Sequence, residues 1–161
     1  MSESEILDTG LPISRMSGIH VAGPTSLAVN WAEGPRAGRT DIVDLAPALA
    51  RYKIYRPLRE NAELFASAHL IDDGDAIAWG ADGLDMSAEL IESLAEETMT
   101  ADEFSRFLRR NQLTQEAAAA LLGRSRRQIG YYLKRGPVPR VVALACIGYE
   151  ALSARRKADA A

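Results

Sequence analysis

Two adjacent arginines, Arg126 and Arg127, stand near the start of a short predicted helix and are the side chains best suited to chemistry. A guanidinium can donate a bidentate pair of hydrogen bonds to O6 and N7 of guanine in the DNA major groove. Gly130 and Tyr131 follow on the same outward side. Glycine inside a helix costs about 1 kcal/mol relative to alanine, which a close approach to DNA would explain, and so would close helix packing. These four residues are our candidates for reading DNA bases.

Two short helices joined by a tight turn must position these side chains. We expect the first helix to start at Thr114, whose hydroxyl can cap the amides of the first turn. Gly123 is predicted to end it in the left-handed conformation, and Ser125 is a good N-cap for the second helix. Helix-turn-helix proteins present side chains to the major groove in this way. The alternative is a helical hairpin in a small bundle that does not contact DNA.

The opposite side of each helix is expected to form a small core. The alanines from Ala117 to Ala120 favour helix and let the second helix approach closely. Apolar residues three or four positions apart share one face of a helix. In the first helix Leu121 and Leu122 are expected to supply apolar contact. The residues of the second helix that are predicted to pack inward are Ile129, Tyr132 and Leu133.

Residues Asn111 to Lys134 resemble the DNA-binding core of the Cro/C1-type, or lambda-repressor-like, regulators. The resemblance lies in Leu113-Thr114-Gln115-Glu116 and in Leu122-Gly123-Arg124-Ser125. It implies that Gln115 touches a phosphate or braces the recognition helix. The base-reading positions that it implies are Arg126, Arg127 and Tyr131. Such domains often have five helices, whereas four are predicted here, so the last helix would have to close the core alone.

Phosphate contacts are expected around the same two helices. Lys134, at the far end of the second helix, is better placed for a phosphate than for a base. The full set of predicted phosphate ligands is Gln115, Arg124, Ser125, Lys134 and Arg135. Such modules commonly bind as two-fold dimers on spaced half-sites. We therefore expect a homodimer on double-stranded DNA, with the interface in either the front domain or the long last helix.

Charge is divided unevenly along the 161 residues, although the formal net charge is only -3. Residues 101–161 carry a net charge of +7, and residues 1–100 carry -10. Phosphate attraction needs a local positive field, which the last third of the chain provides. The acidic part is expected to face away from DNA or to meet another partner.

Composition sets further limits. The length allows one domain or two small ones. No apolar run approaches the roughly 20 residues of a membrane span, and the acidic start lacks the features of a secretory signal, so a cytoplasmic protein is expected. The single cysteine, Cys146, lies in an apolar run and is predicted to be a buried structural thiol.

The front of the chain is predicted to be α+β, with a small, mostly antiparallel sheet. Alternation and turn signals predict strands over 18–22, 26–31 and 39–45, and a hairpin of 68–71 with 76–79. A short helix or an irregular segment is expected over 47–55, a break at 56–58, and helical segments over 60–67 and 88–97. The predicted domains are a loosely ordered N-terminus (1–15), an acidic α+β domain (16–97) and an all-α, basic helix-turn-helix domain (98–158).

The front domain resembles the bacterial family called domain of unknown function twenty-four forty-two, over roughly Ile19 to Leu94. The segments that carry the resemblance are Asp44-Leu45, Tyr52 to Arg59, Leu64-Phe65, Ala76 to Trp79 and Gly83 to Asp85. The family occurs alone or fused to a helix-turn-helix, and small members are similar to antitoxins. The alternative function is therefore an antitoxin-like module whose front domain binds a protein partner while the helix-turn-helix autoregulates its gene.

No enzyme is predicted, and no catalytic residue, metal or cofactor. The chain has neither a phosphate-binding glycine loop nor a nucleophile elbow. His20 and His69 are not at metal-ligand spacing. The aspartates of 72–75 fit a hairpin turn better than a calcium loop. Trp31 and Trp79 are expected in the front core.

A small basic and aromatic patch interrupts the acidic front domain. It consists of Arg51, Tyr52, Lys53, Tyr55, Arg56 and Arg59. The patch could contact DNA or a partner protein. The alternative is a solvent-exposed edge of the domain, which would have the same sequence pattern.

Overall fold

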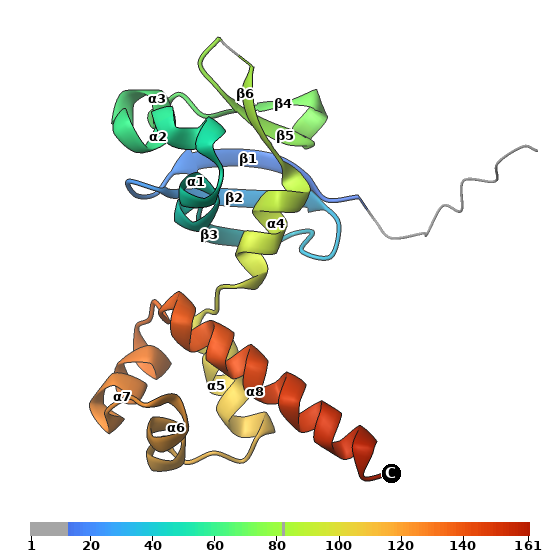
Figure 1. The fold of residues 1–161 in the computed structure, drawn as a ribbon, viewed down its shortest axis with the longest axis vertical. Coiled ribbons are helices and arrows are strands. Elements are labelled where there is room, and N and C mark those ends of the chain that lie inside the picture. Colours follow the sequence, from blue (N-terminus) through green and yellow to red (C-terminus); the bar gives the residue numbers. More distant parts are fainter. Residues whose placement is uncertain (1–12, 82) are drawn as a thin grey trace, which may run out of the picture. The chain divides into compact units, whose positions relative to one another are not determined.

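Figure 1 shows the computed structural model, which describes residues 13–81 and 83–161. The chain folds into two compact units, residues 1–95 (the front unit) and residues 96–161 (the back unit). The fold class is α+β, as predicted, because strands and short helices build the front unit and helices build the back unit. The boundary expected from the charge reversal lies two residues further along the chain.

The first three strands form an antiparallel sheet in the order β1-β2-β3. They are β1 (Arg15–Val21), β2 (Ser26–Glu33) and β3 (Thr40–Asp44). In the central strand, Leu27, Val29 and Trp31 are buried at every second position, as expected when one face of a sheet covers a core.

Three shorter strands form a second antiparallel sheet, in the order β4-β5-β6, so the predicted sheet is in fact two. They are β4 (His69–Ile71), β5 (Ala76–Trp79) and β6 (Leu84–Ser87). The predicted turn between the first two is confirmed as a short 3-10 segment, Asp72–Gly74. Gly74 has φ +93°, and a Cβ there would collide with the carbonyl oxygen of Met16. This turn therefore requires glycine.

Short helices complete the front unit. They are α1 (Ala46–Arg51), a 3-10 helix (Lys53–Tyr55), α2 (Arg56–Glu60), α3 (Ala62–Ala66) and α4 (Ala88–Glu96). The break predicted at 56–58 is wrong, because Pro57 lies in the first turn of α2, where its missing N–H leaves no helical hydrogen bond unmade. Ser87 caps α4, since its Oγ accepts from the amide of Leu90 at 3.2 Å.

Both tryptophans lie in the core of the front unit, as predicted. Trp31 is 2% exposed and Trp79 is 1% exposed. The indole N–H of Trp79 donates to the carbonyl of Phe65 at 3.2 Å, and the two rings stack with centroids 6.3 Å apart. A single apolar cluster takes in residues of both sheets and α4.

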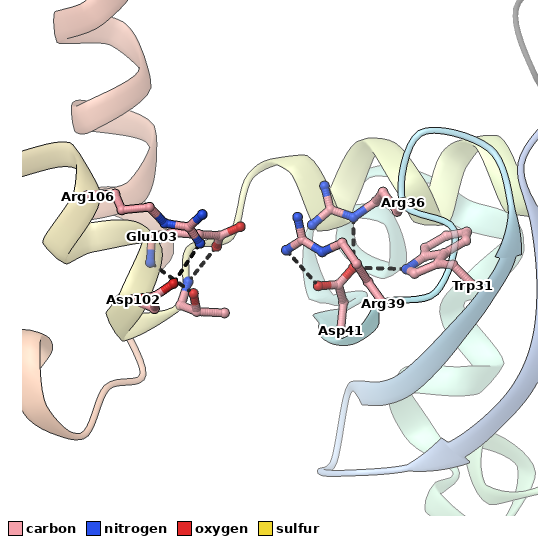
Figure 2. A network of polar contacts seen from close by, with 8 residues as sticks. Trp31, Arg36, Arg39, Asp41, Asp102, Glu103 and Arg106 are labelled. Carbon is pink, nitrogen blue, oxygen red and sulfur yellow. Dashed lines mark hydrogen bonds and ion pairs between the residues drawn. The ribbon is translucent and has the colours of Figure 1, made fainter. Parts of the chain in front are cut away.

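A buried carboxylate, Asp41, joins β3 to the loop before it (Figure 2). It accepts hydrogen bonds from Trp31 Nε1 at 2.9 Å, Arg36 Nε at 2.7 Å and Arg39 at 3.2 Å. Burial alone would raise the pKa of this carboxyl. The hydrogen bonds and the two arginine charges outweigh that effect and hold the pKa of Asp41 below its usual value of 3.8.

The front unit starts earlier than predicted. Arg15 opens β1, whose pairing with β2 is irregular in its first residues and so escapes a simple alternation pattern. Ser14 is buried, and its hydroxyl donates to the carboxylate of Glu92. These contacts shorten the predicted loose segment 1–15, of which residues 1–12 lie outside the described part.

Four helices build the described back unit, as many as predicted. They are α5 (Ala101–Arg110), α6 (Gln115–Leu122), α7 (Arg126–Lys134) and α8 (Arg140–Asp159). Thr100 caps α5, because its hydroxyl accepts from the amide of Glu103 at 3.1 Å while the Glu103 carboxylate accepts from the amide of Thr100 at 2.8 Å (Figure 2). None of the described helices is long and apolar enough to cross a membrane.

The core of the back unit is separate from that of the front unit. Its main buried residues are Phe104, Phe107, Ala118, Ile129, Tyr132, Val142 and Cys146. Cys146 is fully buried, as predicted, and its burial, together with the charge of Glu150, raises the pKa of the thiol to about 12. The thiol therefore stays protonated and packs as a small apolar side chain.

Candidate nucleic-acid interface

The helix that precedes the candidate site, α6, has the predicted ends. Thr114 Oγ1 accepts from the amide of Ala117 at 3.1 Å. At the other end Gly123 adopts φ 61° and ψ 39°, the left-handed conformation that glycine reaches at least cost. Because these end signals are local, they fix the length of α6 independently of its packing.

The recognition-helix candidate, α7, begins with a complete capping box. Ser125 Oγ accepts from the amide of Gln128 at 3.2 Å, and Gln128 Oε1 accepts from the amide of Ser125 at 2.9 Å. This fixes the start of α7 immediately before the two arginines. The Ser125 hydroxyl is thus first a helix cap, and only its own hydrogen is left to donate to a phosphate.

The inner face of α7 fills the core as predicted. Ile129 is fully buried and Tyr132 is 6% exposed. The ring of Tyr132 packs edge-on against that of Phe104, with the ring centroids 5.8 Å apart. Ala118 and Ala119 of α6 are buried opposite this face, which agrees with the close approach expected of alanines. Of the two leucines expected to supply apolar contact, Leu122 packs against this core, whereas Leu121 is 41% exposed.

The outer face of α7 carries the predicted base-reading side chains. Arg126 and Arg127 are exposed, and Tyr131 is 51% exposed. Whereas α5 and α6 carry acids in their first turns, α7 has none and begins with two cations. Cations at the positive end of a helix dipole cost stability, about 0.3–1 kcal/mol each at a surface. This locally unfavourable choice gives the N-terminus of α7 the positive potential that an anion requires.

Gly130 lies half-buried on α7 opposite Gln115 of α6. A Cβ at Gly130 would be 3.9 Å from Gln115 Oε1, an ordinary van der Waals distance. Packing within the back unit therefore does not demand glycine at this position. The sequence left two explanations for this glycine, close helix packing and a close approach to DNA, and the structure does not support the first.

One carboxylate at the site was missed by the sequence analysis. Glu116 Oε1 lies 3.0 Å from a guanidinium nitrogen of Arg126, an ion pair between α6 and α7. In the sequence Glu116 signals only a favourable charge in the first turn of α6. Glu116 and Arg126 lie on two helices joined by a turn, so the helical repeat of the sequence could not predict that they form a pair.

The predicted phosphate ligands lie at both ends of α7 and, in the case of Gln115, on α6 beside the middle of α7. Gln115 is exposed at the start of α6, beside Gly130. Arg124 is half-buried, and its guanidinium donates to the carbonyl of Gly123 at 3.4 Å. Lys134 and Arg135 are exposed at the far end of α7. The fold thus places a cation or amide on each side of the base-reading candidates.

Comparisons with known proteins add the following. No protein-family model matches the chain, and no curated protein matches it. Among solved structures it is similar to the crystal structure of a "Putative DNA Binding Protein" from Nitrosomonas europaea ATCC 19718. The sequence identity is 26%, the match covers 87% of each chain, and the TM-score is 0.42.

Proposed function

We propose that the protein is a sequence-specific DNA-binding transcriptional regulator that places α7 in the major groove. The outer face of α7 carries this proposal. Two exposed arginines open a helix whose inner face is fully used by the core, and nothing in the first turn balances their charge from within α7. Arginines at the start of a helix can reach the O6 and N7 atoms of guanine.

The proposed roles follow from position along α7. Arg126 and Arg127 read bases, Tyr131 contacts a base or the backbone, and Gly130 lets the DNA come close. The phosphate ligands are Gln115, Arg124, Ser125, Lys134 and Arg135. In this proposal the back unit is a Cro/C1-type domain, the protein acts as a repressor and as a homodimer, and it works by binding rather than by catalysis.

A titration with two DNA duplexes tests the proposal. The full-length protein is titrated against the DNA upstream of its own gene and against a random duplex of equal length, at two salt concentrations. A preference for the upstream DNA that persists at the higher salt supports a sequence-specific regulator, because non-specific binding weakens steeply with salt. Equal and salt-sensitive binding to both duplexes would contradict it for this DNA.

A surface of the front unit favours the antitoxin-like alternative. Ile54 is 63% exposed and Tyr52 is 40% exposed, between Arg51 and Lys53. The guanidinium of Arg51 lies 5.6 Å from the centre of the Tyr52 ring. Aromatic and arginine side chains are enriched in protein–protein interfaces. On this alternative the front unit, which resembles domain of unknown function twenty-four forty-two, binds a protein partner through these residues.

Co-expression separates the two candidate functions. If the alternative holds, the protein encoded by the neighbouring reading frame should co-purify with the wild-type chain. An Ile54→Lys variant should lose that partner, whereas an Arg126→Ala, Arg127→Ala variant should retain it. Retention by the Ile54→Lys variant would remove this surface from the interface.

A further inference from the structure

The last helix, α8, is apolar on two opposite faces. One face packs into the back unit through Val142 and Cys146, which are 2% and 0% exposed. The other face carries large apolar side chains at the surface. These are Val141 (61% exposed), Leu144 (44%), Ile147 (43%) and Leu152 (49%). A surface helix normally exposes polar residues on the side away from its core, so this second face fits a binding surface.

Small residues lie among these large ones on the same face. Ala145, Gly148 and Ala151 are exposed, and a Cβ at Gly148 would meet nothing within 4 Å. The back unit itself therefore gives no reason for a glycine in the middle of α8, where glycine disfavours helix. A second helix that crosses α8 at Gly148 would give one, because the missing side chain lets two helix backbones approach closely.

We infer that this face of α8 pairs with α8 of a second copy of the chain, antiparallel and two-fold symmetric about Gly148. In such a pair, positions equally far from Gly148 lie opposite each other. Leu144 then faces the partner's Leu152, and Ala145 faces the partner's Ala151. At these two pairs of positions large meets large and small meets small, and Val141 faces the partner's Arg155, whose methylene groups can cover it. An isologous interface requires self-complementarity of this kind.

Charge along α8 also matches this arrangement. The N-terminal end of α8 begins with Arg140, whose charge is paired with that of Glu97 at 3.4 Å. The opposite end carries Arg155, Arg156 and Lys157 and runs on past the other helices of the unit (Figure 1). Antiparallel pairing keeps the basic ends of the two copies apart, whereas parallel pairing would place them side by side, where their like charges repel.

This inference deepens the proposed function, since a pair of copies would carry two recognition helices. The inference is tested without DNA, so that its failure can be distinguished from a failure of the proposed function. The mass of the full-length protein is measured by sedimentation and by light scattering over a range of concentrations. A dimer that binds no specific DNA would leave the inference standing and contradict the proposed function. A wild-type chain that remains monomeric would overturn the inference.

A Leu144→Lys variant locates the interface. Each dimer carries the substitution twice in an apolar contact, so the dissociation constant of the dimer should rise on the order of 100-fold. Leu121→Lys, at a residue of similar exposure on α6, is the matched control and should dimerise like the wild type. Circular dichroism checks that both variants are folded. Unchanged dimerisation of the Leu144→Lys variant would remove α8 from the interface.

Cysteine cross-linking tests the direction and the centre of the pair. The native Cys146 is buried and its thiol has a raised pKa, so it should contribute little cross-linking of its own. Under mild oxidation, Gly148→Cys should cross-link with itself. Ala145→Cys should cross-link efficiently only when mixed with Ala151→Cys, because disulfides need Cα atoms about 4.4–6.8 Å apart. Efficient self-cross-linking of Ala145→Cys would indicate parallel helices and overturn the antiparallel pair.

Discussion

The guanidinium of Arg126 on α7 lies 3.0 Å from the carboxylate of Glu116 on α6. The two side chains are 69% and 63% exposed, and an ion pair this open to solvent is worth about 0–1 kcal/mol. The pair therefore orients Arg126 without locking it in place. A carboxylate at this point also repels nearby phosphates, so Glu116 is expected to lower the affinity for DNA.

Replacing Glu116 with glutamine should raise the affinity for duplex DNA several-fold at low salt. The change removes one negative charge beside Arg126 and keeps the shape of the side chain. The gain should be similar for specific and random duplexes and should shrink as salt rises. Fluorescence anisotropy titrations measure it. Asp159→Asn, the same charge change at the end of α8, is the control, and an equal gain there would point to net charge alone.

The variant Arg126→Ala with Arg127→Ala should lose sequence preference. Each good arginine–guanine pair is worth about 1–3 kcal/mol, so affinity for the specific duplex should fall roughly to that for random DNA. Lys134→Ala with Arg135→Ala removes the same charge but should weaken binding to both duplexes alike and flatten the salt dependence. Paired titrations of the two variants measure the contrast. Normal specific affinity in the first variant would refute the base-reading assignment.

Gly130→Ala separates a DNA role from a structural one. Because the new methyl group would sit at van der Waals distance from Gln115, alanine should fit and stabilise α7 by about 0.5–1 kcal/mol. Affinity for specific DNA should nevertheless fall if the DNA approaches this position. Thermal unfolding and DNA titration of the same sample give both values. Higher stability with unchanged DNA affinity would show that Gly130 does not face the DNA.

Asp41→Asn should destabilise the front unit by about 1–3 kcal/mol near neutral pH, because it removes the charged partner of the nearly buried Arg36. The folded-state pKa of Asp41 is below the unfolded value, so its contribution is complete above that value and is lost as pH falls through the folded pKa. The difference between wild type and variant should therefore be constant above about pH 5 and should shrink progressively as the pH falls below that value. Tryptophan fluorescence in urea reports on this unit, which holds both tryptophans. A stability difference between wild type and variant that does not change with pH would contradict the lowered pKa of Asp41.

The sequence by itself determined the features that depend on neighbouring residues. The caps at Thr114 and Ser125 and the left-handed Gly123 follow from hydrogen bonds and backbone sterics within a few positions. The inward face of α7 follows from the helical repeat, which places Ile129 and Tyr132 on one side. These local rules also gave the α+β class and the helices of the back unit.

Only the tertiary structure decided which of these elements meet. It divided the front strands into two sheets, turned Leu121 outward, and brought Glu116 to Arg126 and Gln115 to Gly130. The angle at which two helices cross is set by the packing of all their side chains together, and no short-range pattern encodes it. The sequence could therefore name the side chains of the candidate site, while the packing of α6 against α7 decided which groups surround them.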